Sequence, residues 1–113
     1  MRTYRGGCHC GQVKFEFDGP QHLTALECNC SICIRKHAKM GMAKKGQLKI
    51  THGKENLSLY KFGTNIAEHF FCKTCGIYTH HGRKSDPSGI GFNTGCLEGV
   101  NPFELKAEIL NNK

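Results

Sequence analysis

The sequence predicts a mostly β, antiparallel fold with one or two short helical turns, and three observations predict it. Several short stretches alternate between apolar and polar residues, as in residues 13–17 and 57–62. Glycine-containing turns separate these stretches by about 8–12 residues, which is typical of short antiparallel strands. Seven of the eight cysteines fall into three tight clusters. Bound metal is therefore expected to help close a small domain whose apolar core is lean.

Each expected strand is bounded by a turn signal or a cysteine cluster. Residues 13–17 run into Asp18-Gly19-Pro20, and residues 57–62 run up to Gly63. One early helix is expected over residues 32–39, with Ser31 as its N-cap. Residues 103–110 fit a short strand or a short helix. The expected strands are, in order, residues 13–17, 23–28, 48–50, 57–62, 67–71, 77–80 and 90–94.

Length and composition favour one small metal-binding domain over residues 1–113. Hydrophobic residues make up 38% of the chain and there is no Trp. No apolar run approaches the roughly 18 residues of a membrane span, and the N-terminus lacks the apolar region of a signal peptide. We therefore expect a reducing cytoplasm, where thiols stay free. A disulfide framework is the alternative, but strained C-x-C pairs argue against it.

The charge of the chain is compatible with a small anionic substrate. The formal net charge is +7, but it falls to roughly +4 if two zinc ions bind and deprotonate their thiols. The sequence also lacks a basic stripe interleaved with aromatic residues, since its densest basic run is residues 35–39. Nucleic acid is therefore not the expected partner.

The first metal site is expected around Cys72-Lys73-Thr74-Cys75-Gly76, a zinc knuckle in which two thiolates face one ion. A structural zinc needs four ligands, and Cys8 and Cys10 are the best additional donors because they lie in a glycine-flanked turn. A closed site of these four cysteines would join positions more than sixty residues apart, where a cross-link restrains the unfolded chain strongly. A thioredoxin-like redox pair is the alternative for the C-x-x-C motif.

The second metal site is expected at Cys28, Cys30 and Cys33. Three protein ligands with one open coordination position are typical of catalytic zinc. A structural site completed by Cys96 or a histidine, or a set of free buried thiols, stays open as an alternative.

These clusters and their flanks resemble the glutathione-dependent formaldehyde-activating enzyme family, which includes the centromere protein V group. The resemblance rests on Gly7-Cys8-His9-Cys10-Gly11, Cys28-x-Cys30-Ser31-x-Cys33, Phe71-Cys72-x-x-Cys75-Gly76-Ile77 and Gly95-Cys96-Leu97. It implies a β-tent-like zinc fold, a structural zinc on Cys8, Cys10, Cys72 and Cys75, and an active-site zinc on Cys28, Cys30 and Cys33. The cofactor expectation is two zinc ions per chain.

The implied activity is that of a carbon–sulfur lyase of S-hydroxymethylglutathione synthase type. Its partners would be a glutathione-like thiol and a small aldehyde such as formaldehyde. Such a reaction needs a group that moves one proton, and the candidates are His37, His80 and His81. Anion contacts are expected from Arg35, Lys36 or Arg83, and Cys96 is expected to pack as a small apolar residue.

The alternative function is a non-catalytic zinc-binding module that engages a protein or a nucleic acid. The basic charge and the centromere-linked branch of the family favour it. The β-tent architecture also occurs in proteins that bind small GTPases, but fold analogy alone does not assign function.

Overall fold

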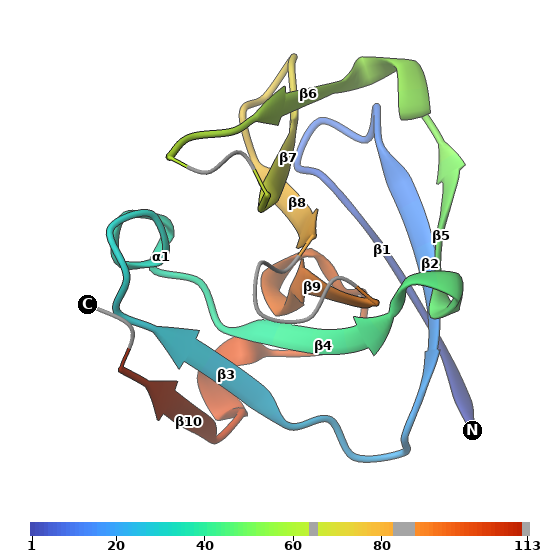
Figure 1. Cartoon of the computed structure of the whole chain (residues 1–113). Helices are drawn as coiled ribbons and strands as arrows, with labels where there is room; N and C mark the ends of the chain where they lie inside the picture. Colours follow the sequence, from blue (N-terminus) through green and yellow to red (C-terminus); the bar gives the residue numbers. More distant parts are fainter. Residues whose placement is uncertain (64–65, 83–87, 112–113) are drawn as a thin grey trace.

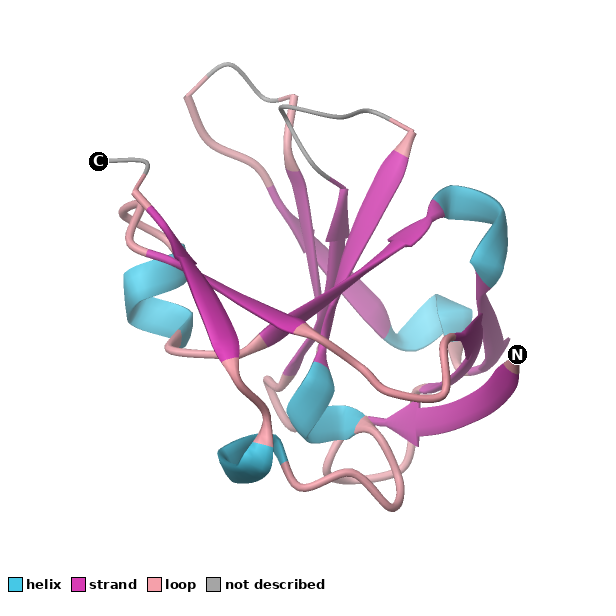
Figure 2. Ribbon diagram, turned by 90° about the horizontal axis from the view of Figure 1, so that it is seen from below, coloured by secondary structure: helices cyan, strands magenta, loops and turns pink. Residues whose placement is uncertain are grey.

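Two open β-sheets form the molecule (Figures 1 and 2), and a computed structural model describes residues 1–63, 66–82 and 88–111. The smaller sheet has the order β1-β2-β5 and the larger has the order β10-β3-β4-β9-β8-β7-β6. The smaller sheet contains β1 (Arg2–Gly7), β2 (Lys14–Gly19) and β5 (Leu48–His52). The larger contains β3 (Ala25–Cys28), β4 (Met40–Lys44), β6 (Leu57–Tyr60), β7 (Glu68–Cys72), β8 (Tyr78–Gly82), β9 (Gly89–Asn93) and β10 (Ala107–Leu110).

Helical structure is limited to short turns, so the predicted mostly β class is confirmed. The one described α-helix is α1 (Cys33–Lys36). The described 3-10 turns are η1 (Lys45–Gln47), η2 (Lys54–Asn56), η3 (Thr94–Cys96) and η4 (Pro102–Glu104). No helix in the described ranges is long and apolar enough to cross a bilayer.

The described strand pairs are antiparallel with one exception. β10 lies parallel to β3, pairing Ala107 with Ala25 and Leu110 with Cys28. Residues 103–110 had fitted either a strand or a helix. In the structure they contain the end of the turn η4 and then the strand β10. The pairing also places β10 at the sheet edge beside the end of β3, where the middle cysteine cluster begins.

The strands β1 and β4 were not predicted, and each of them contains a buried glycine. In β1 the residues that face inward include Tyr4 and Gly6. In β4 the buried residues are Met40 and Gly41, and a Cβ at Gly41 would collide with the ring of Phe92. A strand that alternates through glycine carries little apolar signal in the sequence.

The predicted early helix is wrong in its length and its cap. It spans Cys33–Lys36 rather than residues 32–39, and its N-cap is Ile32, with no side-chain hydrogen bond at the cap. His37 adopts a left-handed conformation with φ 50°, and its N–H closes the turn on the Cys33 carbonyl at 2.9 Å. The left-handed residue stops the helix after one turn.

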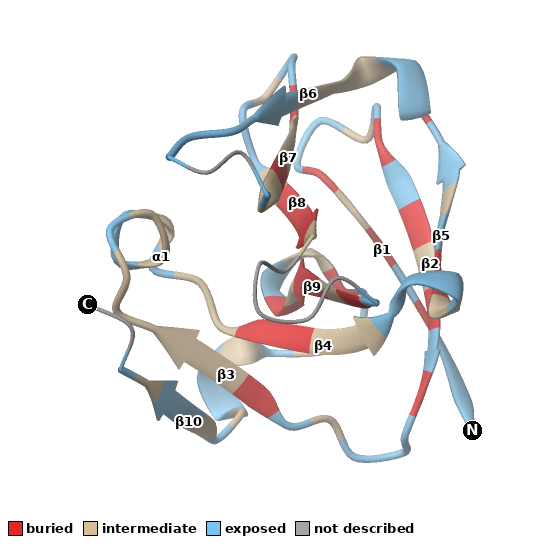
Figure 3. Ribbon diagram, in the orientation of Figure 1, coloured by how far each residue is buried: buried red, intermediate tan, exposed pale blue. Residues whose placement is uncertain are grey.

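The apolar core lies where the two sheets face each other (Figure 3). The rings of Phe17 from β2 and Phe92 from β9 are 4.7 Å apart between centroids, so they join the smaller sheet to the larger one. An isolated bridge between Gly6 and Leu97 adds a second link between the sheets. The buried members of this core are Tyr4, Phe15, Phe17, Leu48, Phe92 and Leu97.

Candidate metal centres

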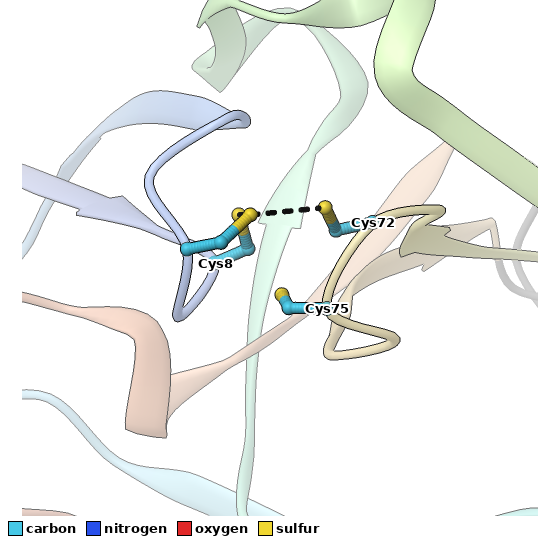
Figure 4. Close-up of side chains that lie close together, drawn as sticks. Cys8, Cys72 and Cys75 are labelled. Atoms are coloured by element: carbon cyan, nitrogen blue, oxygen red, sulfur yellow. Dashed lines mark hydrogen bonds between the residues drawn. The ribbon is translucent and has the colours of Figure 1, made fainter.

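The first cysteine cluster brings together the four residues that the sequence grouped. Cys8 and Cys10 lie on the loop that follows β1, Cys72 ends β7, and Cys75 lies in the turn before β8. Their four sulfur atoms all lie within 4.8 Å of one another, and Figure 4 shows Cys8 facing Cys72 and Cys75 across the gap between the two loops. The cluster therefore links the smaller sheet to the larger one.

The spacing of these sulfurs fits a tetrahedral metal site. The Sγ atoms of Cys8 and Cys10, and those of Cys10 and Cys72, are 3.7 Å apart. Four thiolates at a Zn–S distance of about 2.3 Å would form a tetrahedron with edges of about 3.8 Å. The observed separations are far longer than the roughly 2.05 Å of a disulfide bond. The donor set and its spacing fit zinc.

Hydrogen bonds support thiolates in this first cluster. Val13 N–H donates to the Cys8 sulfur and the Asn56 amide donates to the Cys72 sulfur, both at 3.3 Å. Burial opposes charge on Cys72, but donors led by the Cys75 N–H lower its pKa to about 6. For Cys10, the Gln12 N–H favours the thiolate, but desolvation and the neighbouring sulfurs raise its pKa to about 11. Four such thiols resist full ionisation unless a cation joins them.

The second cluster gathers Cys28, Cys30 and Cys33, whose sulfur atoms also lie within 4.8 Å of one another. Cys28 ends β3 and Cys33 begins α1. All three are half-buried, and no fourth Cys, His, Asp or Glu ligand joins them within the described ranges. This set fits a metal ion held by three protein thiolates with one position left for a substrate.

The sulfurs of the second cluster differ in acidity. Burial raises the pKa of the Cys30 thiol, but hydrogen bonds, first from the Cys33 N–H, outweigh burial and lower it overall. Burial, and then the Cys30 sulfur, raise the pKa of Cys33 to about 12. The two thiols thus share charge unequally until a cation neutralises them.

A cavity of about 150 Å³ borders this cluster between α1 and the β3–β10 edge. Cys28 and Cys33 form part of its wall. The lining residues are Glu27, Cys28, Asn29, Cys33, Ile34, His37, Ala38 and Ile109. This volume is below the roughly 300 Å³ at which typical ligand pockets begin, so it matches a small reactant or one part of a larger one.

Of the candidate anion contacts, the half-buried Lys36 points inward against β7 and β8, whereas Arg35 lies at the surface. The ammonium of Lys36 lies 2.9 Å from His69 Nδ1 and 3.8 Å from the centre of the Tyr78 ring. Burial lowers the Lys36 pKa to about 8, although the Cys33 and Cys30 thiolates oppose this fall. The exposed Arg35 instead donates to the Ser31 carbonyl at 2.7 Å. Arg83 lies outside the described residues.

The three candidate histidines are in different settings. His80 and His81 are buried in β8, where His80 Nδ1 lies 2.9 Å from the Thr79 hydroxyl and His81 Nδ1 lies 2.6 Å from the Tyr78 hydroxyl. Burial, aided by the Lys36 charge, lowers the His80 pKa to about 4. His37 is exposed and lines the cavity.

Two residues of this site were not recognised in the sequence, namely His69 and Tyr78. Both residues contact the Lys36 ammonium, although they lie 33 and 42 positions further along the chain. No local sequence motif predicts a contact over such a separation. Cys96 packs against the main core, as expected, although it is half-buried rather than buried. Its sulfur lies 3.6 Å from the Tyr78 carbonyl.

Comparisons with known proteins point to one family. Its model, described as glutathione-dependent formaldehyde-activating enzyme, matches residues 3–113. A protein of Halomonas elongata named "Putative glutathione-dependent formaldehyde-activating enzyme" is 34% identical in an alignment of 79 positions. The match covers 62% of this chain and 50% of that protein. The chain thus spans about half the length of this curated relative.

The fold is shared with a protein of Rhodobacter sphaeroides whose crystal structure has been solved. The two superimpose with a TM-score of 0.85 at 45% sequence identity. The match covers 92% of this chain and 99% of the other. The arrangement of strands described above is therefore that of a known structure.

Proposed function

This chain belongs to the glutathione-dependent formaldehyde-activating enzyme family, and from that premise we propose that it catalyses the reversible addition of a glutathione-like thiol to a small aldehyde such as formaldehyde. The observation that carries the proposal is the second cysteine cluster, which has three thiols and no fourth protein ligand in the described ranges and which borders a small cavity. The product with glutathione and formaldehyde would be S-hydroxymethylglutathione, and the reverse reaction is that of a carbon–sulfur lyase.

The proposal includes two zinc ions with different roles. Cys8, Cys10, Cys72 and Cys75 would hold a structural ion, and Cys28, Cys30 and Cys33 would hold the ion of the active site. When bound, zinc supplies Lewis acidity, which lowers the pKa of a thiol or polarises a carbonyl oxygen. Since both sites need free thiolates, we place residues 1–113, as one zinc-binding domain, in a reducing compartment such as the cytoplasm.

The protein residues around the cavity would orient the reactants and transfer one proton from the thiol to the product hydroxyl. In the forward direction the thiol loses its proton, a sulfur–carbon bond forms, and the carbonyl oxygen ends as a hydroxyl. His37 is the best placed of the three candidate histidines to carry that proton, because it lines the cavity and also reaches solvent. The rings of His80 and His81 are buried against neighbouring hydroxyl groups.

Exchange spectroscopy on ¹³C-formaldehyde and glutathione tests this function directly. Wild-type protein with two zinc ions per chain should accelerate interconversion between free and glutathione-bound formaldehyde. Cys28→Ala should lose the acceleration while keeping its β-sheet spectrum, because it removes one of three ligands at the cavity. Cys96→Ala is the matched control and should stay active, since Cys96 belongs to neither cluster. An inactive zinc-loaded wild type, or an active Cys28→Ala, would contradict the proposal.

A further inference from the structure

Lys36 is a half-buried cation without a carboxylate partner. The side-chain ion pairs among the described residues are Arg5 with Glu16 and Lys61 with Glu68, and neither involves Lys36. A buried charge without an opposite charge is unfavourable. On α1, Lys36 follows Cys33 by three positions, so the two side chains lie on neighbouring parts of the helix surface. Lys36 is therefore a cation placed beside a cysteine of the second cluster.

The position of the Lys36 ammonium is fixed from the opposite side of the site. His69 of β7 lies 2.9 Å from it, and the Tyr78 ring of β8 lies beneath it at 3.8 Å. An ammonium has only donors, so Nδ1 of His69 accepts. One hydrogen bond and one cation–π contact hold the charge, which leaves the ammonium with further donors to offer.

His69 has an arrangement that packing alone does not explain. Because Nδ1 accepts from Lys36, the proton of the neutral ring lies on Nε2. That atom is buried and has no hydrogen-bond partner in the described part of the chain. The ring is stacked between Phe62 and His81. Unsatisfied buried donors are uncommon in folded proteins and call for an explanation. Here Nε2 of His69 has no hydrogen bond within the described residues, while Nδ1 holds the Lys36 ammonium.

We propose that Lys36 is a catalytic residue whose ammonium donates a hydrogen bond to the aldehyde oxygen as that oxygen becomes anionic, and that His69 is the positioning residue that aims it. This assignment rests on the proposed function and names the group that binds the oxygen in the same site. Neither the spacing of the cysteines nor the family comparison assigns a role to either residue.

The step balances without any further reactant. The thiolate sulfur forms a bond to the carbonyl carbon, and the carbon–oxygen π pair moves onto oxygen. The ammonium stabilises that negative charge, and the proton that the thiol lost is returned to the oxygen. A fixed donor in a partly dehydrated site is worth far more to such an oxyanion than the same donor in water.

The cavity and the Lys36 side chain lie on different sides of Cys33. The cavity wall includes Cys33, Ile34 and His37 from one side of α1, and it does not include Lys36. The Lys36 side chain instead extends toward β7 and β8. The proposal therefore places the aldehyde oxygen on the Lys36 side of Cys33.

Three variants and one control test the assignment. Lys36→Met keeps the length of the side chain and removes its charge. His69→Phe keeps a ring between Phe62 and His81 and removes the hydrogen bond to Lys36. Arg35→Met is the matched control, since it removes an exposed positive charge from the same helix. The double variant Lys36→Met/His69→Phe closes a mutant cycle.

The expected results separate catalysis from support of the fold. Lys36→Met should retain both zinc ions and lose about 100-fold in kcat/KM, the typical effect of removing one oxyanion donor. His69→Phe should lose part of this, mainly in kcat. The double variant should be no slower than Lys36→Met, because His69 acts through Lys36. Arg35→Met should match wild type. Independent losses that multiply would show that His69 is merely structural.

Formate provides a readout that needs no turnover, because it has the carbon of formaldehyde and a permanently negative oxygen. Calorimetric titration should show formate binding to wild type and to Arg35→Met, and at least tenfold weaker binding to Lys36→Met. Equal affinities, or loss of zinc from Lys36→Met, would overturn the assignment. If Lys36→Met does not fold, weaker formate binding by His69→Phe decides the question. Wild type that binds formate through Lys36 but accelerates no exchange would refute the proposed function instead.

Discussion

Replacing Cys72 by serine should destabilise the protein much more than replacing Cys30 by serine. The perturbation removes a sulfur that is fully buried and hydrogen-bonded to Asn56, and it leaves a polar group of similar shape. With only three good ligands left, the first cluster should hold zinc weakly. The tie between the loop after β1 and the end of β7 is then lost.

The magnitude follows from the loop that the metal closes. Cys10 and Cys72 are separated by 62 positions. A cross-link across a loop of that length lowers the entropy of the unfolded chain and thereby stabilises the folded state by about 4 kcal/mol. Cys28 and Cys33 close a loop of only about five residues, for which the same relation gives about 2 kcal/mol. For 113 residues, these figures correspond to falls in Tm of roughly 17 °C and 8 °C.

Circular dichroism melts of both serine variants, each with its zinc content measured, provide the assay. Denaturant unfolding at 25 °C, in buffer with a thiol reductant, gives the free energies independently. Equal shifts for the two variants, or a larger shift for Cys30→Ser, would refute the reasoning that the first cluster is the long-range tie and the second a local site.

Three further perturbations have expected outcomes. Gly91→Ala should lower the free energy of unfolding by about 1–3 kcal/mol, because its Cβ would collide with the His81 ring. Gly46→Ala is the control, since nothing lies near the added Cβ, and it should change this free energy by less than about 0.5 kcal/mol. Equal effects of the two variants in urea unfolding would contradict this packing. Burial lowers the pKa of His80 to about 4, so the neutral ring stabilises the fold fully above its usual pKa, and this stabilisation is lost as pH falls toward 4. Between pH 7 and 5 the free energy of unfolding of wild type should fall by about 2 kcal/mol more than that of His80→Phe. Equal falls in the two proteins would count against a buried neutral ring. Burial lowers the Lys36 pKa to about 8, so turnover that needs the ammonium should fall as pH rises through about 8, and the same falling limb in Lys36→Met would show that another group causes it.

The sequence predicted the two cysteine clusters better than the strands, because residues that can bind metal are marked by their type and spacing. Cys72 and Cys75 face one point whatever the rest of the chain does, since a C-x-x-C turn brings its sulfurs together. The pairing of this turn with Cys8 and Cys10 followed from the need for four ligands. The roles of these residues as zinc ligands stay a proposal.

Strands that carry glycine on the buried face were not predictable from periodicity. In β4, Gly41 is buried because the Phe92 ring occupies the space where a side chain would stand. Only the neighbouring strand explains this choice of residue. The left-handed His37, which ends α1 early, was not predictable from the helical pattern either, since a positive φ is uncommon for residues other than glycine even though histidine is among those enriched there.

The candidate site was predictable only in its local part. The three cysteines of the second cluster lie within six residues, whereas Lys36, His69 and Tyr78 are joined by the packing of α1 against β7 and β8. A single sequence carries no signal for such a contact. Arg35 was an equally reasonable candidate until the structure showed that it turns back to the Ser31 carbonyl.

Stepwise removal of metal tests most directly the central claim that the two cysteine clusters have different roles. Zinc-loaded protein is titrated with a chelator while released zinc, thiol–aldehyde exchange and the β-sheet circular dichroism signal are recorded on one sample. We predict that the first equivalent of zinc leaves with all of the activity and little of the fold, and that the second leaves only as the protein unfolds. Release of both ions in one step with unfolding, or unfolding with activity retained on the folded remainder, would contradict the claim.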